Sequence, residues 1–68
     1  MRVTVNGSEH ELPEGATVRD AVLAAGAGAD ERGVAVALDG TVVRRLDWDA
    51  TPLHETARLE VLRATAGG

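Results

Sequence analysis

The sequence predicts an α+β fold in which one mixed sheet of four to five strands wraps a single helix. Three observations lead to this prediction. Short runs of alternating apolar residues recur along the chain, as half-buried strands require. An Asn-Gly pair and an Asp-Gly pair each separate two such runs, which is typical of tight hairpins. One segment, Val18 to Ala25, has helical spacing together with helix start and stop signals.

Composition sets the limits of the fold and of its partners. The 68 residues suffice for one domain with a small core, built mainly from nine valines, seven leucines and twelve alanines. No cysteine is present, so a disulfide and cysteine chemistry are excluded. Eleven acidic residues against seven arginines give a net charge of −4, which argues against non-specific nucleic-acid binding. Neither a leader pattern nor a long apolar run is evident, and we expect a cytoplasmic protein without a membrane segment.

The first half of the chain reads as a hairpin followed by a helix. Met1–Val5 alternates, Asn6-Gly7 turns the chain, and Ser8–Leu12 forms the return strand. Thr17 with Asp20 three residues later resembles a capping box and begins the helix. Gly26 directly follows its last residue, as a C-terminal cap does.

The second half reads as short strands joined by turns. We expect a loop at Ala27–Gly33, a strand at Val34–Leu38, a turn at Asp39-Gly40, a short strand at Thr41–Arg45, a turn or short 3₁₀ segment at Leu46–Leu53, a turn at His54–Thr56 and a last strand at Ala57–Ala64. A hairpin, a crossing helix and further strands make up the β-grasp, or ubiquitin-like, order. The first and last strands should then be central, adjacent and parallel. This assigns residues 1–64 to the domain and residues 65–68 to a flexible tail.

Few side chains suggest chemistry within the domain. His10 and His54 lie far apart and lack the spacing of metal ligands, so no metal or cofactor site is expected. Trp48 has two interpretations, a cap on the small core or an anchor at an interface, and the core is favoured. Ser8 is the one serine, and no Gly-rich loop opens a helix, so the chain is not expected to be an enzyme.

The final residues suggest a reactive end. Gly67 and Gly68 follow the last predicted strand, and two glycines add no packing to a fold. A Gly-Gly carboxylate is unshielded and can enter a narrow channel, with Ala66 as part of the same slender stem. The alternative interpretation is an ordinary frayed terminus.

One predicted surface could guide that end into a partner. If the strands at Val34–Leu38 and Ala57–Ala64 are neighbours, a flat patch of small apolar residues lies on the open face of the sheet. Its predicted members are Ala35, Ala37, Leu62 and Ala64, and its predicted rim is Arg58 and Arg63. Scattered apolar surface residues are the alternative interpretation.

Taken together, these segments resemble the thiamine-biosynthesis sulfur carriers of the ThiS family, over essentially the whole chain. The matching pieces are Val3-Thr4-Val5-Asn6-Gly7, Thr17-Val18, Val34 to Gly40, Val42-Val43, Trp48 to Leu53, Leu59 to Leu62 and Gly67-Gly68. No short run is specific, but the combination in this order is. Family members often have Pro in place of Arg44 and Gly-Asp in place of Glu55-Thr56, which are differences at turns.

The resemblance implies a function for the tail. A ubiquitin-activating-like adenylyltransferase of the ThiF type would adenylate the Gly68 carboxylate with ATP. Sulfur from a cysteine desulfurase or sulfurtransferase would displace the adenylate and leave a C-terminal thiocarboxylate. A thiazole synthase of the ThiG type would then receive the sulfur. The chain itself would carry no active site.

Three alternatives stay open at this point. The small subunit of molybdopterin synthase has the same fold and chemistry, although that family tends to be longer and richer in aromatic residues. A carrier could also serve the synthesis of cysteine, modified tRNA or a natural product. In a different class, the protein would be a ubiquitin-like interaction module with an inert tail.

Overall fold

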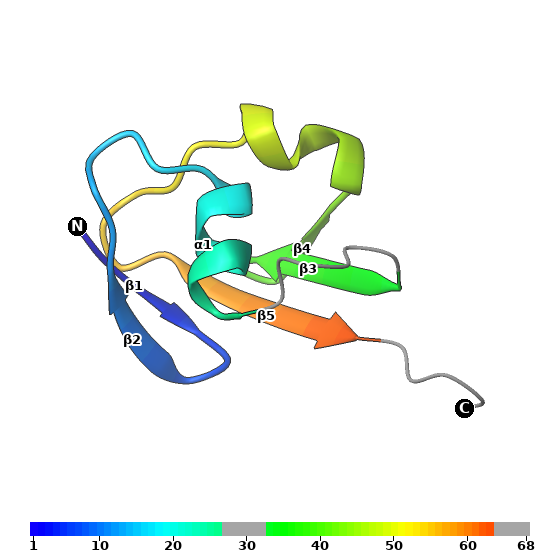
Figure 1. Cartoon of the computed structure of the whole chain (residues 1–68), viewed down its shortest axis with the longest axis horizontal. Coiled ribbons are helices and arrows are strands. Elements are labelled where there is room, and N and C mark those ends of the chain that lie inside the picture. Colours follow the sequence, from blue (N-terminus) through cyan, green and yellow to red (C-terminus); the bar gives the residue numbers. More distant parts are fainter. Residues whose placement is uncertain (27–32, 64–68) are drawn as a thin grey trace.

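The computed structural model of the chain describes residues 1–26 and 33–63. Its elements follow the predicted order (Figure 1): β1 (Arg2–Val5), β2 (Ser8–Glu11), α1 (Val18–Ala24), β3 (Val34–Leu38), β4 (Thr41–Val43), the 3₁₀ helix η1 (Arg45–Ala50) and β5 (Arg58–Arg63). The strands form one five-stranded sheet in the order β2-β1-β5-β3-β4. The predicted α+β fold of the β-grasp type is confirmed, and β1 and β5 are central, adjacent and parallel.

Turn residues explain the two hairpins. Asn6 and Gly7 have φ values of 52° and 85°, and Asp39 and Gly40 have 49° and 87°. Two successive positive φ values define the turn whose twist suits a two-residue hairpin, and Asn, Asp and Gly tolerate it best. Both hairpins are therefore specified by residues of the turns themselves.

The helix begins and ends close to its sequence signals. The Asp20 carboxylate accepts the backbone N–H of Thr17 at 2.8 Å, as the capping-box pattern predicts. Ala25 is the C-terminal cap and Gly26 follows with φ 84°. Ala25 is exposed rather than part of the buried face, because the helix has already ended there.

One segment differs from its prediction. The strand expected at Thr41–Arg45 stops at Val43, because the chain enters η1 at Arg45. The Asp47 N–H donates to the Arg44 carbonyl at 2.8 Å, which sets the tighter 3₁₀ geometry from the start. The short 3₁₀ segment expected within Leu46–Leu53 is thus present but begins earlier.

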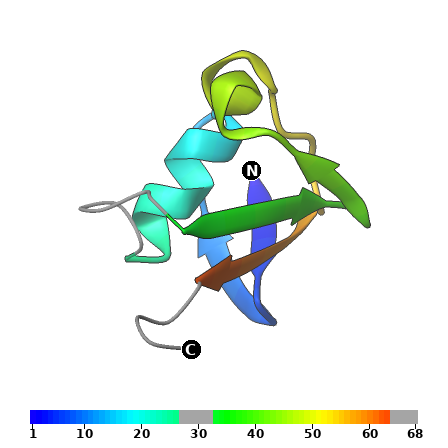
Figure 2. The same cartoon turned by 90° about the vertical axis from the view of Figure 1, so that its right-hand side faces the viewer.

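The core lies on one side of the sheet only. Figure 2 shows α1 lying against one face of the sheet, with η1 at the end of the same layer. Val18, Ala21 and Val22 of α1 are fully buried against the sheet, and Trp48 of η1 closes the end of the core. Sheet residues packed in the same cluster are Val3, Val5, Val36 and Leu59. The opposite face of the sheet has no covering layer among the described residues, and this face holds the candidate site.

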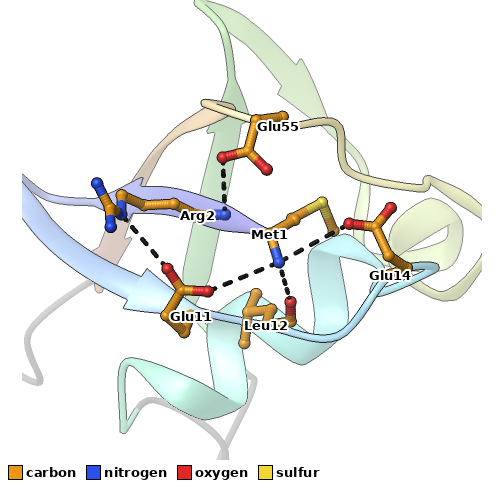
Figure 3. Close-up of polar contacts among 6 residues, drawn as sticks. All are labelled: Met1, Arg2, Glu11, Leu12, Glu14 and Glu55. Atoms are coloured by element: carbon orange, nitrogen blue, oxygen red, sulfur yellow. Dashed lines mark hydrogen bonds and ion pairs between the residues drawn. The ribbon is translucent and has the colours of Figure 1, made fainter.

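The amino-terminal end of β1 is held by polar contacts (Figure 3). The Met1 amino group donates to the Leu12 carbonyl at 2.7 Å and lies 3.7 Å and 3.8 Å from carboxylate oxygens of Glu11 and Glu14. The Arg2 N–H donates to Glu55 at 3.1 Å. These contacts fix β1 between β2 and the turn before β5. Within residues 1–26 and 33–63, no helix has the length and apolar character needed to cross a membrane.

Candidate functional site

The last strand places the candidate site in the middle of the sheet. β5 pairs with β1 on one side through Thr4–Arg58 and Val5–Leu59, and with β3 on the other side from Leu38–Leu59 to Val34–Arg63. A central strand has its backbone groups paired on both sides, so it is the most firmly held part of a sheet. The predicted reactive tail therefore follows a firmly held strand in the sequence.

The open face beside this strand carries an apolar patch. Ala35 pairs directly with Leu62, and Ala37 pairs on its other side with Val42. Residues paired across strands share a face, so these four side chains lie close together on the open face of the sheet. Leu62 and Val42 are 70% and 71% exposed. We call Ala35, Ala37, Val42 and Leu62 the apolar sheet patch.

Sequence reasoning predicted three of these four residues and missed Val42. Val42 lies on a three-residue strand, which has too few positions for alternation to reveal a face. Its place follows from the register with Ala37. Ala64, the fourth predicted member, lies outside the described residues, as do the predicted stem residues Ala66 and Gly67 and the predicted reacting residue Gly68.

The two arginines predicted at the rim of the patch lie on opposite faces of the sheet. Arg58 is exposed and has the same strand parity as Glu60 and Leu62, so it lies on the patch face. Arg63 pairs with Val34 and has the parity of Leu59, so it lies at the end of the opposite face. The prediction that Arg63 lies at the rim of the patch is therefore corrected. Successive residues of a strand point to opposite faces of the sheet, and Arg63 follows Leu62 directly.

A cluster of polar contacts holds Arg58 at the edge of the patch. The Asp39 carboxylate accepts the Arg58 N–H at 3.0 Å and contacts His54 Nε2 at 2.6 Å. His54 Nδ1 lies 2.8 Å from the Glu55 carbonyl oxygen. Both ring nitrogens thus face acceptors, which the doubly protonated ring satisfies. The turn between β3 and β4 is thereby joined to the segment that enters β5.

These contacts also shift two pKa values. The Arg58 N–H, followed by the His54 ring, lowers the pKa of Asp39 from its usual 3.8. The hydrogen bond to Asp39, followed by that to the Glu55 carbonyl, raises the pKa of His54 from 6.5. The sequence placed His54 in a turn but did not reveal its partner, which lies fifteen residues away.

Shallow depressions on the open face do not resemble an enzyme pocket. One is lined by Thr4, Asn6, Gly7, Arg58, Leu59 and Glu60. Among the described residues, no group of three or more His, Asp or Glu side chains could hold a metal ion. What this face offers is a flat surface with one apolar end, which suits a protein partner better than a small molecule.

Comparison with known proteins gives a consistent result. The model of the ThiS family matches residues 2–68. A crystal structure of the thiamine biosynthesis protein ThiS from Geobacter metallireducens is 31% identical, with a TM-score of 0.78 and full coverage of both chains. An NMR solution structure of a thiamine biosynthesis protein from Geobacter metallireducens is 33% identical, with a TM-score of 0.77; the match covers 100% of this chain and 88% of that one. No curated protein sequence matches this chain.

Proposed function

The chain belongs to the ThiS family, and on this premise we propose that it carries sulfur for thiamine biosynthesis as a thiocarboxylate on Gly68. The observation that carries the proposal is the family match over residues 2–68, which includes the terminal Gly67 and Gly68. The coarser function, a sulfur carrier in thiamine biosynthesis, is supported both by the family and by the similar ThiS structures. The thiocarboxylate chemistry and the particular partners are the parts that the proposal adds.

In the proposed chemistry the tail supplies the reacting carboxylate, and partner proteins supply the groups that activate it. A carboxylate is a poor electrophile until one oxygen becomes a good leaving group, so ATP on an adenylyltransferase would activate Gly68. The outer sulfur of a persulfide on a desulfurase or sulfurtransferase would then attack the acyl carbon and displace AMP, which leaves an acyl disulfide. A thiol of a partner protein would cleave this disulfide, forming a new disulfide with the partner's cysteine and releasing the thiocarboxylate. The resulting thiocarboxylate is ionised at neutral pH and would attack its acceptor on a thiazole synthase without a base from this chain. In this proposal the protein is a substrate, and the catalytic groups belong to its cytoplasmic partners.

The apolar sheet patch is the proposed docking surface for these partners. Leu62 lies at the end of the strand that precedes the tail, so a partner holding Leu62 is already close to the residues that lead to Gly68. Ala35, Ala37 and Val42 widen the patch across β3 and β4. On β5 the patch is bordered by Glu60, which pairs with Ala37, and Arg58 follows further along the same face. Ala64 would continue the patch, and Ala66 and Gly67 would form the stem that enters the active site of the partner.

Intact-mass measurement tests the proposal. The protein is incubated with its cognate adenylyltransferase, ATP and a sulfur donor, and we expect a mass gain equal to the exchange of one oxygen for one sulfur, localised to Gly68. A variant lacking Gly68 should gain no sulfur yet keep its melting temperature, because the buried core lies between Val3 and Leu59. Absence of any gain with a demonstrably active partner would instead support an inert interaction module.

A gene deletion separates the proposed pathway from its chemical relatives. If the proposal is right, the deletion strain requires thiamine, and a plasmid encoding the full chain restores growth without it. Loss of molybdoenzyme activity with normal thiamine synthesis would assign the carrier to molybdopterin synthase. A requirement for neither would point to another sulfur-transfer pathway.

A further inference from the structure

The last strand extends further than its parallel neighbour. The register between β1 and β5 ends with Val5 and Leu59, after which the Asn6 N–H donates to the Leu59 carbonyl at 2.9 Å. At Asn6 the chain takes a φ of 52° and turns away into the hairpin. β5 continues to Arg63, and Figure 1 shows it running past the turn between β1 and β2. Beyond Leu59, the β1 side of this strand therefore lies beside the turn rather than beside a strand.

The Asn6 side chain pairs with the backbone at this position. Its Nδ2–H donates to the Val61 carbonyl at 3.0 Å, and its Oδ1 accepts the Val61 N–H at 2.8 Å. A carboxamide has the same donor and acceptor as a peptide group. The side chain thus acts as one further residue of β1, and both backbone groups of Val61 are paired.

The far end of β5 is consequently held from two sides. On the β3 side, Leu62 pairs with Ala35 and Arg63 pairs with Val34. On the other side, Asn6 holds Val61, which directly precedes Leu62 of the apolar sheet patch. Without the carboxamide, only β3 would hold the end of this strand, and strand ends held on one side fray more readily.

We infer that Asn6 is a positioning residue for the proposed reaction, holding the end of β5 so that the tail starts from a fixed place beside the apolar sheet patch. The inference rests on the proposed function, in which a partner docks on Leu62 and takes Gly68 into its active site. If the strand end is not held, the partner must order it on binding, and this cost weakens binding. Once the complex has formed the geometry is restored, so the effect falls on KM rather than on kcat.

Two substitutions remove this interaction in different ways. Asn6→Gly deletes the carboxamide but keeps a residue that accepts the positive φ of the turn. Asn6→Asp also tolerates that φ and keeps an acceptor for the Val61 N–H, but it sets a carboxylate oxygen against the Val61 carbonyl. Val22→Ala is the control, because Val22 is a fully buried helix residue whose truncation lowers stability without removing a contact to β5 backbone.

Amide hydrogen exchange tests whether Asn6 holds the end of β5. In both Asn6 variants we expect the Val61 amide to exchange faster, while the Thr4 amide, which donates to the Ala57 carbonyl at 2.9 Å, changes only with global stability. In Val22→Ala the two amides should change together. An unchanged ratio of Val61 to Thr4 exchange in the Asn6 variants would overturn the inference.

Steady-state kinetics with the adenylyltransferase test whether Asn6 contributes to the proposed reaction. We expect a roughly tenfold higher KM in the Asn6 variants at unchanged kcat, the size expected for ordering about one residue on binding. If the Asn6 variants have the same KM as Val22→Ala, the inference about Asn6 is overturned while the proposed function stands. Failure of the unmodified protein to act as a substrate at all would overturn the proposed function, and with it the role assigned to Asn6.

Discussion

Asp39 shows how one side chain can serve two purposes. Its backbone takes the positive φ that the hairpin turn requires, and its carboxylate joins His54 to the N–H of Arg58. Aspartate suits both tasks because its short polar side chain tolerates the left-handed region and accepts hydrogen bonds near its own backbone. The turn beside the apolar sheet patch is thereby tied to the start of β5.

The pair of Asp39 and His54 predicts a pH dependence of stability. The pKa of His54 is raised in the folded state, so its contribution is complete below 6.5 and is lost as pH rises through the folded value. The pKa of Asp39 is lowered, so its contribution is complete above 3.8 and is lost as pH falls. We therefore expect the free energy of unfolding to decrease as the pH rises from about 6.5 through the raised pKa of His54.

Urea denaturation across this pH range measures the effect. His54→Gln should flatten the decrease, because the group that binds the extra proton in the folded state is gone. His10→Gln is the matched control, since His10 lies on β2, which β1 and β5 separate from β3 and the turn with Asp39, and it should keep the slope of the unmodified protein. A slope that survives in His54→Gln would assign the dependence to other groups.

Thr56 has an unfavourable backbone conformation that the surrounding structure maintains. It has a φ of 66°, which is uncommon for a residue with a branched Cβ. Its N–H donates to the Arg2 carbonyl at 2.7 Å, so the bend before β5 is held by β1. The sequence resemblance leads us to expect Asp at this position, and Asp accepts such a φ more easily. The difference noted in the sequence is thus one of turn geometry.

At the scale of elements, η1 closes the core through a single aromatic side chain. Trp48 is fully buried, its Nε1–H donates to the Val43 carbonyl at 3.0 Å, and the Arg19 guanidinium lies 5.7 Å from its ring centre. The Arg19 Nε also contacts the Asp49 carboxylate at 2.6 Å, which links α1 to η1. Of the two interpretations of Trp48, the core position is the one observed.

Truncating this side chain should nearly unfold the protein. Replacing a buried Trp by Ala costs about 3–5 kcal/mol, which is a large share of the roughly 5–15 kcal/mol that stabilises a small domain. We expect Trp48→Ala to lose most of its cooperative thermal transition, measured by circular dichroism. Leu46→Ala on the same 3₁₀ helix should change stability by less than about 0.5 kcal/mol, because Leu46 is 88% exposed. Equal effects of the two variants would contradict the assigned role of Trp48.

At the scale of the whole molecule, the two faces of the sheet have different roles. α1 and η1 cover one face and form the core, whereas the other face bears the apolar sheet patch. None of the four patch residues belongs to the buried core cluster. Binding and folding can therefore be altered independently.

Leu62→Asp tests this separation. We expect its melting temperature to stay close to that of the unmodified protein, because Leu62 is 70% exposed. Thiocarboxylate formation should require at least about tenfold more protein, since an apolar contact of the proposed docking surface is lost and a charge is added. Leu46→Asp, which places the same charge on η1, should leave the reaction unchanged. Equal activity of Leu62→Asp and the unmodified protein would exclude the patch as the docking surface.

Much of the fold could be predicted from the sequence because its signals are local. Asn6-Gly7 and Asp39-Gly40 specify their turns by the φ values that these residues tolerate, and Thr17 with Asp20 specifies the start of the helix. Strand order then followed from the rule that a crossing helix joins parallel strands. The candidate site was predicted only in part, since Val42 was missed and Arg63 was placed on the wrong face.

By itself, the sequence determined the order of the elements, the β-grasp class and the Gly-Gly end on which the proposed function depends. Only the tertiary structure decided that Asn6 pairs with Val61 and that His54 meets Asp39. The physical reason is that turns and caps depend on neighbouring residues, whereas contacts between distant residues depend on strand register. Backbone hydrogen bonds are nearly the same for all residue types, so the register between strands that no tight turn joins is set only when the whole core packs.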